Sequence, residues 1–242
     1  DIDYKEIKDI GNGIVDSAKT AIASKLDKNK GYVVFNPHSF ACGGSVVVDG
    51  ETMLVNDMPS KGYKLTNDFR RGNHIEIDGH KVETDIFTVT FDEFWQIVSI
   101  YDKKNDREVL KAGAKANEIR LYADHPDTYD NWEWQCYSVD KYKTLTDFES
   151  AGIVEDGARR GIKLVRPYQK SKITQTIWFW DDIAKIDFDT VADWHQHHIM
   201  VKAAFPVDVN SDKATYEIQF GTIERPTHTN TSWDAAKFEV CA

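Results

Sequence analysis

The chain has 242 residues and a formal net charge of -10, because its 40 Asp and Glu residues outnumber its 30 Lys and Arg residues. This acidic balance excludes a nucleic-acid binder that relies on a basic surface. Hydrophobic residues make up 41% and charged residues 29% of the chain, and no apolar stretch is long enough to span a bilayer, so disordered, collagen-like and membrane classes are excluded too.

The cysteines and the first residues bear on the location of the protein. Cys42, Cys136 and Cys241 are widely spaced and odd in number, so they form neither a disulfide framework nor a C-x-x-C motif. The start of the chain lacks the basic flank and apolar core of a signal peptide. We therefore expect a cytoplasmic protein, and the missing initiator Met indicates a processed or excised piece.

Residues 1–28 differ from everything after them, because their apolar side chains recur at steps of three and four, the period of one helix face. These residues are Ile7, Ile10, Ile14, Ala18, Ala21, Ile22 and Leu26. The pattern predicts one helix of about six turns, although Gly11 and Gly13 disfavour it. A helix with such an apolar face needs a partner.

From Gly31 onward the hydrophobic period changes to two, which predicts strands. Early runs are Tyr32–Phe35 and Ser45–Val48, which are followed by the turn signals Asn36-Pro37 and Asp49-Gly50 respectively. The alternation over 185–193 places Ile186, Phe188, Thr190 and Ala192 on one face, and Tyr216, Ile218 and Phe220 repeat that pattern. The run from Ile173 to Trp180 indicates deeper burial. About a dozen strands with no helix between them favour antiparallel sheets in a large sandwich.

The closing residues, 237–242, are typical of a strand with no turn after it. An edge left open at that point would be unpaired, so we expect the natural protein to continue.

Three polar segments could carry chemistry. The first, residues 124–134, combines carboxylates and amides that bond hydroxyl groups with aromatic rings that stack on a sugar's C–H face. An ordered loop, with Asp residues capping turns and Trp residues pinning it to the core, explains the same composition.

The second segment, residues 193–198, places His195 and His197 two apart, on one face if the strand continues. Two such histidines can share a metal ion, but no third ligand is evident, and half-exposed strand residues explain them better. The third, residues 224–234, is expected to be a polar loop after the Tyr216–Phe220 strand. Its Arg225 offers a planar fork of donors to a carboxylate or to two adjacent hydroxyls, and the alternative is an Arg paired locally to hold the loop.

These segments, together with Gly31–Pro37 and Ile97–Leu110, resemble the region downstream of the catalytic domain in glycoside hydrolase family 38 α-mannosidases. The similarity runs in order over essentially the whole chain, and it includes the runs 58–63, 204–207 and 224–240. The closing stretch resembles the cytosolic and vacuolar branch of the family.

The resemblance implies a retaining α-mannosidase that hydrolyses mannosyl oligosaccharides with the help of zinc. The zinc ligands and the Asp nucleophile belong to an upstream catalytic domain, so this chain would hold no catalytic residue and no metal of its own. Residues 1–28 would be the last helix of an upstream bundle. Residues 29–242 would form a β-sandwich of the galactose mutarotase-like supersandwich kind, truncated at its C-terminus. The implied partners are the mannosyl substrate and the catalytic domain, with no nucleic acid and no membrane.

By motif position, the resemblance implies that loops of this chain wall the mannose pocket. The residues implied to bind substrate are Asp124, Tyr129, Asp130, Trp132, Arg225, His228 and Asp234. One departure from the family lies at Phe94-Trp95-Gln96, which replaces a glycine turn, so that hairpin must turn without a ready left-handed residue.

Two other classes of function stay open. A free-standing carbohydrate-binding β-sandwich would use the 124–134 segment and need no catalytic domain. A purely structural module would support a catalytic domain and touch no sugar. The unpartnered helix and the open C-terminal strand favour a piece of a larger enzyme.

Overall fold

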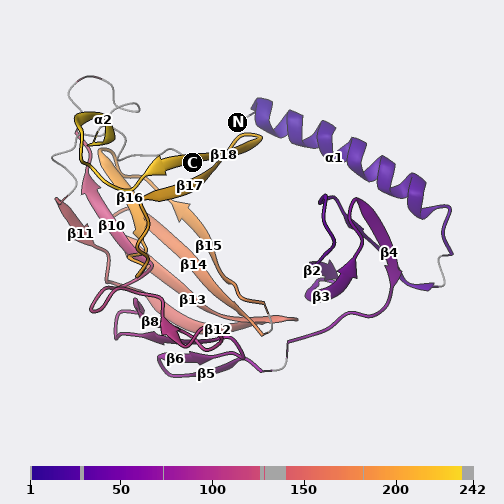
Figure 1. The fold of residues 1–242 in the computed structure, drawn as a ribbon, viewed down its shortest axis with the longest axis horizontal. Coiled ribbons are helices and arrows are strands. Elements are labelled where there is room, and N and C mark those ends of the chain that lie inside the picture. Colours follow the sequence, from indigo (N-terminus) through magenta and orange to yellow (C-terminus); the bar gives the residue numbers. More distant parts are fainter. Residues whose placement is uncertain are drawn as a thin grey trace. The chain divides into compact units, whose positions relative to one another are not determined.

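The computed structural model describes residues 2–27, 30–72, 74–125, 128, 140–181 and 183–235. The chain divides into two compact units, and each draws on two separate stretches of sequence. The first unit contains residues 1–87 and 147–197, and the second contains residues 88–146 and 198–242. Strands dominate both units, which confirms the mainly β class (Figure 1).

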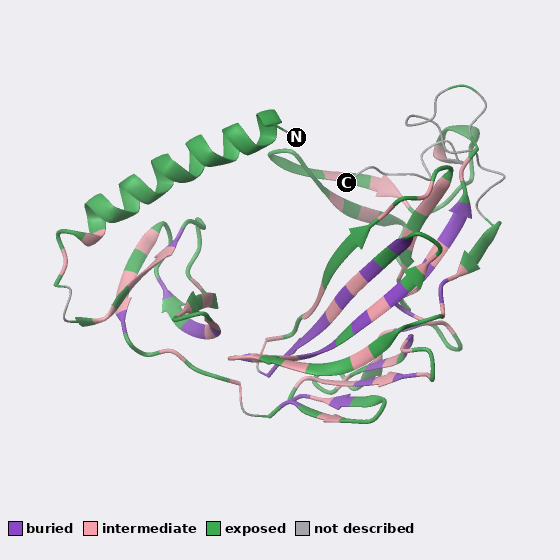
Figure 2. Cartoon of the chain, turned by 180° about the vertical axis from the view of Figure 1, so that it is seen from behind, coloured by how far each residue is buried: buried purple, intermediate pink, exposed green. Residues whose placement is uncertain are grey.

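The first unit opens with helix α1, Ile2–Ala23, whose 22 residues confirm the predicted N-terminal helix. It ends before Leu26, which the periodicity had placed inside it. None of its residues is buried, and the helix is almost entirely exposed in Figure 2. Ile7 and Ile14 are 65% and 66% exposed. No helix in the described part of the chain is long and apolar enough to cross a membrane.

Three antiparallel strand pairs follow in this unit. Strand β1 (Tyr32–Asn36) pairs with β4 (Gly62–Thr66), β2 (Cys42–Val48) with β3 (Glu51–Met58), and β5 (Glu76–Asp78) with β6 (Lys81–Glu83). The β2–β3 turn is Asp49-Gly50, with φ values of 52° and 87°. Two positive φ values are what a tight hairpin turn with right-handed strand twist requires, so this turn signal is confirmed.

The largest sheet of the first unit has the order β12-β13-β14-β15, with every neighbouring pair antiparallel (Figure 1). Its strands are Ser150–Asp156, Arg159–Tyr168, Ser171–Trp180 and Ile186–Asp193. In β14 the four residues Ile177 to Trp180 are all buried, so both faces of that strand are covered there. Leu54, Ala158 and Trp180 form one buried cluster within this unit.

The second unit begins within β7 (Phe87–Phe91). Strand β8 (Ile97–Asp102) pairs with β9 (Arg107–Glu108), and β10 (Glu118–Ala123) lies between β11 (Tyr142–Thr144) and β16 (Ile199–Ala204). Strand β17 (Lys213–Ile218) pairs with β18 (Gly221–Pro226), and the short α2 (Ser232–Ala235) follows. Its most buried residues include Val89, Ile97 and Ala116.

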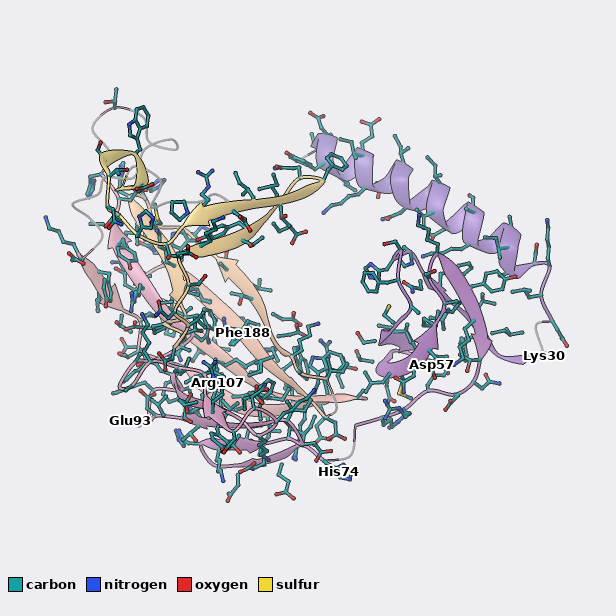
Figure 3. The ribbon with its side chains drawn as sticks, viewed as in Figure 1. Lys30, Asp57, His74, Glu93, Arg107 and Phe188 are labelled. Carbon is teal, nitrogen blue, oxygen red and sulfur yellow. The ribbon has the colours of Figure 1, made fainter. Side chains whose placement is uncertain are left out.

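Side-chain contacts also join distant segments of the second unit. Arg107, labelled in Figure 3, donates from Nη2 to the carbonyl oxygen of Asp208 at 2.8 Å. The neighbouring bridge between Leu110 and Val207 runs antiparallel. Residues around 107–110 and 207–208 are thus held together by both backbone and side-chain bonds.

Two strand predictions are wrong in detail. Phe220 is not a strand residue, because it occupies the β17–β18 turn with φ of 61° and its side chain is exposed. The face predicted buried in β15 is half-buried at Ile186 and Phe188, whereas Thr190 and Ala192 are exposed. β15 is the edge strand of its sheet, so the alternation marks the sheet face but not how far it is covered. The predicted strand at 237–242 lies outside the described residues.

Candidate functional site

Four of the seven residues implied to bind sugar are described, and all four belong to the second unit. They are Asp124, Arg225, His228 and Asp234. Tyr129, Asp130 and Trp132 lie outside the described residues.

Asp124 is held where β10 ends. Its backbone N–H donates to the carbonyl oxygen of His198 at 2.9 Å, which extends the β10–β16 ladder by one bond. The next residue, His125, stacks its ring on His198 with 5.0 Å between centroids and 25° between planes. The half-buried Asp124 therefore sits on a backbone fixed from two sides.

Arg225 is a strand residue, which corrects the prediction that 224–234 is a loop throughout. It lies opposite Ala214 in the β17–β18 hairpin, and Glu224, Arg225 and Pro226 all belong to β18. Its Nε is buried and has no hydrogen-bond partner among the described residues. The local carboxylate pairing that would make Arg225 a loop support is therefore not seen in this part of the chain. A buried guanidinium donor of this kind can bond a carboxylate or a pair of hydroxyls.

His228 and Asp234 are brought together by the loop after β18. His228 Nδ1 lies 3.5 Å from Asp234 Oδ2, and the Asp234 side chain is 17% exposed. The Thr231 hydroxyl donates to the same Oδ2 at 2.7 Å, and the Asp234 N–H donates back to Thr231 Oγ1 at 3.1 Å. This reciprocal pair resembles a capping box at the start of α2 and fixes the carboxylate beside the imidazole.

The start of the same loop is also held by hydrogen bonds of Thr227. The Thr227 N–H donates to the Asp212 carbonyl at 3.1 Å, and the Thr227 hydroxyl donates to the Ser211 carbonyl at 2.5 Å. Thr227, which lies between Arg225 and His228 in the sequence, therefore joins the end of β18 to the residues just before β17. Among the described residues, no hydrogen bond or ion pair joins Asp124 to Arg225, His228 or Asp234.

His195 and His197 are not partners on a strand, because β15 ends at Asp193. His195 Nε2 lies 2.8 Å from Asp193 Oδ1, and its backbone N–H donates to Ser171 Oγ at 2.7 Å. In the described residues, no group of three metal-binding side chains includes either histidine.

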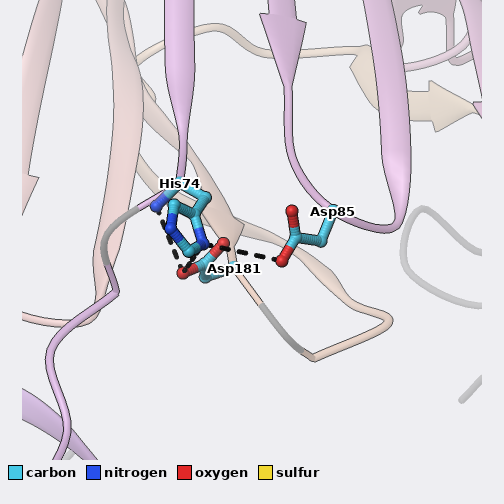
Figure 4. Close-up of side chains that lie close together, drawn as sticks. All are labelled: His74, Asp85 and Asp181. Carbon is cyan, nitrogen blue, oxygen red and sulfur yellow. Dashed lines mark hydrogen bonds and ion pairs between the residues drawn. The ribbon is translucent and has the colours of Figure 1, made fainter.

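The structure does gather a different cluster that the sequence did not indicate, the His–Asp–Asp cluster of His74, Asp85 and Asp181 in the first unit. Their potential ligand atoms all lie within 4.8 Å of one another (Figure 4). The three residues stand in separate segments and form no spaced motif, so the only sequence signal was a polar residue beside each of three strand ends.

Comparison with known proteins identifies the family. Residues 82–242 match the model described as the glycosyl hydrolases family 38 C-terminal domain. The chain belongs to glycosyl hydrolase family 38. The match covers Asp124, Arg225, His228 and Asp234, whereas α1 and the strands up to β5 precede it.

The family-38 chain is similar to α-mannosidases from several organisms. It is 34% identical to human alpha-mannosidase 2C1 over 69% of this chain and 16% of that protein. It is 29% identical to alpha-mannosidase G of Dictyostelium discoideum over 87% of this chain and 19% of that protein. It is 27% identical to mouse alpha-mannosidase 2C1 over 99% of this chain and 25% of that protein. The chain thus spans a quarter or less of the length of these relatives.

Proposed function

We propose that this family-38 chain is a non-catalytic β region of a zinc-dependent, retaining α-mannosidase that hydrolyses mannosyl oligosaccharides. The observation that carries the proposal is the family match over residues 82–242, supported by relatives that are named α-mannosidases. The longer protein that contains this chain is called the parent enzyme below. The upstream domain of the parent enzyme is proposed to supply the nucleophile and the ligands of the catalytic zinc. None of the residues of this chain is assigned to the catalytic zinc.

The role proposed for this chain is to line part of the sugar-binding pocket. Arg225 supports it because its buried Nε is left without a partner among the described residues, and an unpaired buried donor is costly unless a ligand completes it. His228 and Asp234 add a donor and an acceptor on a loop fixed by Thr231. Asp124 adds a second carboxylate on a pinned backbone. Hydroxyl-rich sugars are bound by such donors and acceptors on rigid supports.

A cytoplasmic location is part of the same proposal. It rests on the cysteine usage of the sequence, and Cys42 is a free thiol in the structure. Free thiols are typical of a reducing compartment.

The pocket role is tested in the parent enzyme by Arg225→Ala, with hydrolysis of an aryl α-mannoside as the readout. We expect kcat/KM to fall by about 10- to 100-fold, because a charged hydrogen bond to substrate is worth about 1.5–3 kcal/mol. Lys213→Ala is the matched control, since Lys213 is an exposed cation of the same hairpin that pairs with Glu224. We expect it to leave kcat/KM within about twofold of the unaltered enzyme.

Equal kcat/KM for Arg225→Ala and Lys213→Ala would contradict the pocket role while leaving family membership intact. Saturable binding of a mannosyl oligosaccharide by the 242 residues alone would instead favour the free-standing carbohydrate-binding module.

A further inference from the structure

We propose that the His–Asp–Asp cluster is a binding site for one divalent transition-metal ion, with Zn²⁺ as the best match to its donor set. His74 lies between β4 and β5 and is labelled in Figure 3. Asp85 lies in the turn between β6 and β7, and Asp181 directly follows β14. All three belong to the first unit, so the site is built within one compact part of the chain.

The distances fit ligands of one ion better than hydrogen bonds. His74 Nδ1 lies 3.6 Å from Asp85 Oδ2 and 3.6 Å from Asp181 Oδ2 (Figure 4). Both separations exceed the usual range for a hydrogen bond between nitrogen and oxygen. Tetrahedral bonds of about 2.0–2.2 Å place neighbouring ligand atoms about 3.4 Å apart. The two carboxylate oxygens therefore stand around the imidazole nitrogen at the spacing that a metal ion between them would require.

The cluster is also held in place by its surroundings. The Asp181 side chain is 11% exposed, and its Oδ2 accepts the backbone N–H of His74 at 3.2 Å. The backbone of Gly72 approaches so closely that a Cβ there would lie 2.7 Å from the Ala158 carbonyl oxygen and 3.3 Å from Asp181 Cβ. A glycine at 72 thus leaves room for the backbone to approach Asp181. Hydrogen bonds such as the one from the His74 N–H to Asp181 orient metal ligands.

The opposite side of the cluster is open. The His74 and Asp85 side chains are 68% and 63% exposed. They line a cavity of about 560 Å³ whose other walls include Met53, Arg70 and Arg71. Water can therefore complete the coordination of an ion held by three protein ligands.

The two arginines of this cavity have partners outside the cluster. Arg71 forms an ion pair with Glu51, and Arg70 Nη2 donates to Asn56 Oδ1 at 3.4 Å. An imidazole with two carboxylates is a donor set that suits zinc.

The test is a titration of the metal-free 242-residue chain with zinc chloride, followed by calorimetry, after circular dichroism has shown that it is folded. We expect one equivalent of Zn²⁺ to bind and to raise the midpoint of thermal unfolding. His74→Ala and Asp85→Asn should each weaken zinc binding by tenfold or more. Asp85 is exposed, so its substitution tests the site without disturbing buried structure.

His80→Ala is the matched control, because it removes an exposed histidine from the β5–β6 turn of the same unit. It should leave the zinc affinity unchanged. A folded chain that binds no Zn²⁺, or that binds it equally well with His74→Ala and Asp85→Asn, would overturn the proposal. The cluster would then be a polar contact between one imidazole and two carboxylates, with no metal ion.

Discussion

Single carboxylates in the second unit act as local anchors of the backbone. Glu108 accepts hydrogen bonds from Ser99 Oγ at 2.6 Å and from the N–H groups of Ile100, Val109 and Leu110 at 2.9, 2.9 and 3.0 Å. Burial alone would raise the pKa of Glu108, but these four bonds outweigh it and lower the pKa. The charge of Glu108 thus serves the β8–β9 structure.

Glu108→Gln should destabilise the chain. The amide keeps an acceptor oxygen but removes the charge that strengthens all four bonds, so we expect a loss of about 1–2 kcal/mol in the free energy of unfolding. Urea denaturation measures it. Glu93→Gln, at an exposed position of the same unit, is the control and should change stability by less than about 0.5 kcal/mol. Equal effects of the two substitutions would show that Glu108 is not an anchor.

The folded chain should also lose stability in acid, because some of its carboxyl groups have a lowered pKa in the folded state. Burial favours a raised pKa for Asp92, but the hydrogen bond from Lys115 and the N–H groups of Gln96 and Phe94 lower it overall. Groups whose folded pKa is lowered, such as Asp92 and Glu108, release their protons more readily in the folded chain than in the unfolded one. Their stabilisation is therefore complete above the unfolded carboxyl pKa of about 4, and it is lost as the pH falls through the lower folded values.

We accordingly expect the free energy of unfolding to be lower at pH 3 than at pH 7 and the difference to shrink in Glu108→Gln. Urea denaturation at the two pH values measures both. An unaltered chain that is equally stable at pH 3 and pH 7 would refute this reading of the carboxylates.

Two turns between strands are stabilised in different ways, one by a side-chain cap and one by a glycine. The β7–β8 turn lacks glycine, and Trp95 adopts the left-handed backbone conformation with φ of 59°. Asp92 makes this possible because its Oδ1 accepts the N–H groups of Phe94 and Gln96 at 2.9 and 2.8 Å. The Trp95 ring also packs on Phe91 with 5.7 Å between centroids. A side-chain cap thus stabilises a left-handed turn residue without glycine.

The β12–β13 turn differs from the β7–β8 turn because it requires glycine at its left-handed position. Gly157 has φ of 58°, and a Cβ there would lie 2.0 Å from the Thr52 carbonyl oxygen. The flanking residues hold this approach, since Ala158 N–H donates to the Thr52 carbonyl at 2.7 Å and Asp156 accepts the Thr52 N–H at 2.8 Å. The turn is therefore docked directly on β3.

Gly157→Ala should cost about 3 kcal/mol or more, because it adds a clash with backbone to the strain of a positive φ. Gly79→Ala isolates the strain, since Gly79 has φ of 54° but a Cβ there would meet nothing within 4 Å. We expect about 1–2 kcal/mol there. Thermal or urea unfolding of the two variants measures the difference, and equal losses would mean that the β12–β13 turn is not docked on Thr52.

Across the whole molecule, secondary structure and turns can be predicted from local sequence patterns. Features that depend on the tertiary structure cannot. The helix near the N-terminus, the Asp49-Gly50 turn and the deep burial of Ile173–Trp180 follow from local pattern and are confirmed. The alternation of apolar residues predicts a strand that continues to Phe220, whereas the chain reverses after β17.

The candidate site was predictable only in part. Motif resemblance pointed to Arg225, His228 and Asp234, but it could not show that Arg225 is a strand residue with a buried Nε. The His–Asp–Asp cluster left no sequence motif, because three segments far apart in the chain supply one ligand each. Such clusters follow from the fold and are visible only once the strands are placed.

The apolar side chains of α1 lie uncovered in the described structure, and the mouse relative is similar over 99% of this chain, including that helix. Residues 1–28 as the last helix of an upstream bundle, with residues 29–242 as the β region, remain our proposal for the domain layout.

The most direct test of the proposed function compares hydrolysis of an aryl α-mannoside, with zinc present, by the parent enzyme and by the 242-residue chain alone. We expect turnover by the parent enzyme and none by the isolated chain, because the nucleophile and its zinc are proposed to lie upstream. Turnover by the 242 residues alone, or an inactive parent enzyme that is folded and loaded with zinc, would overturn the proposed function.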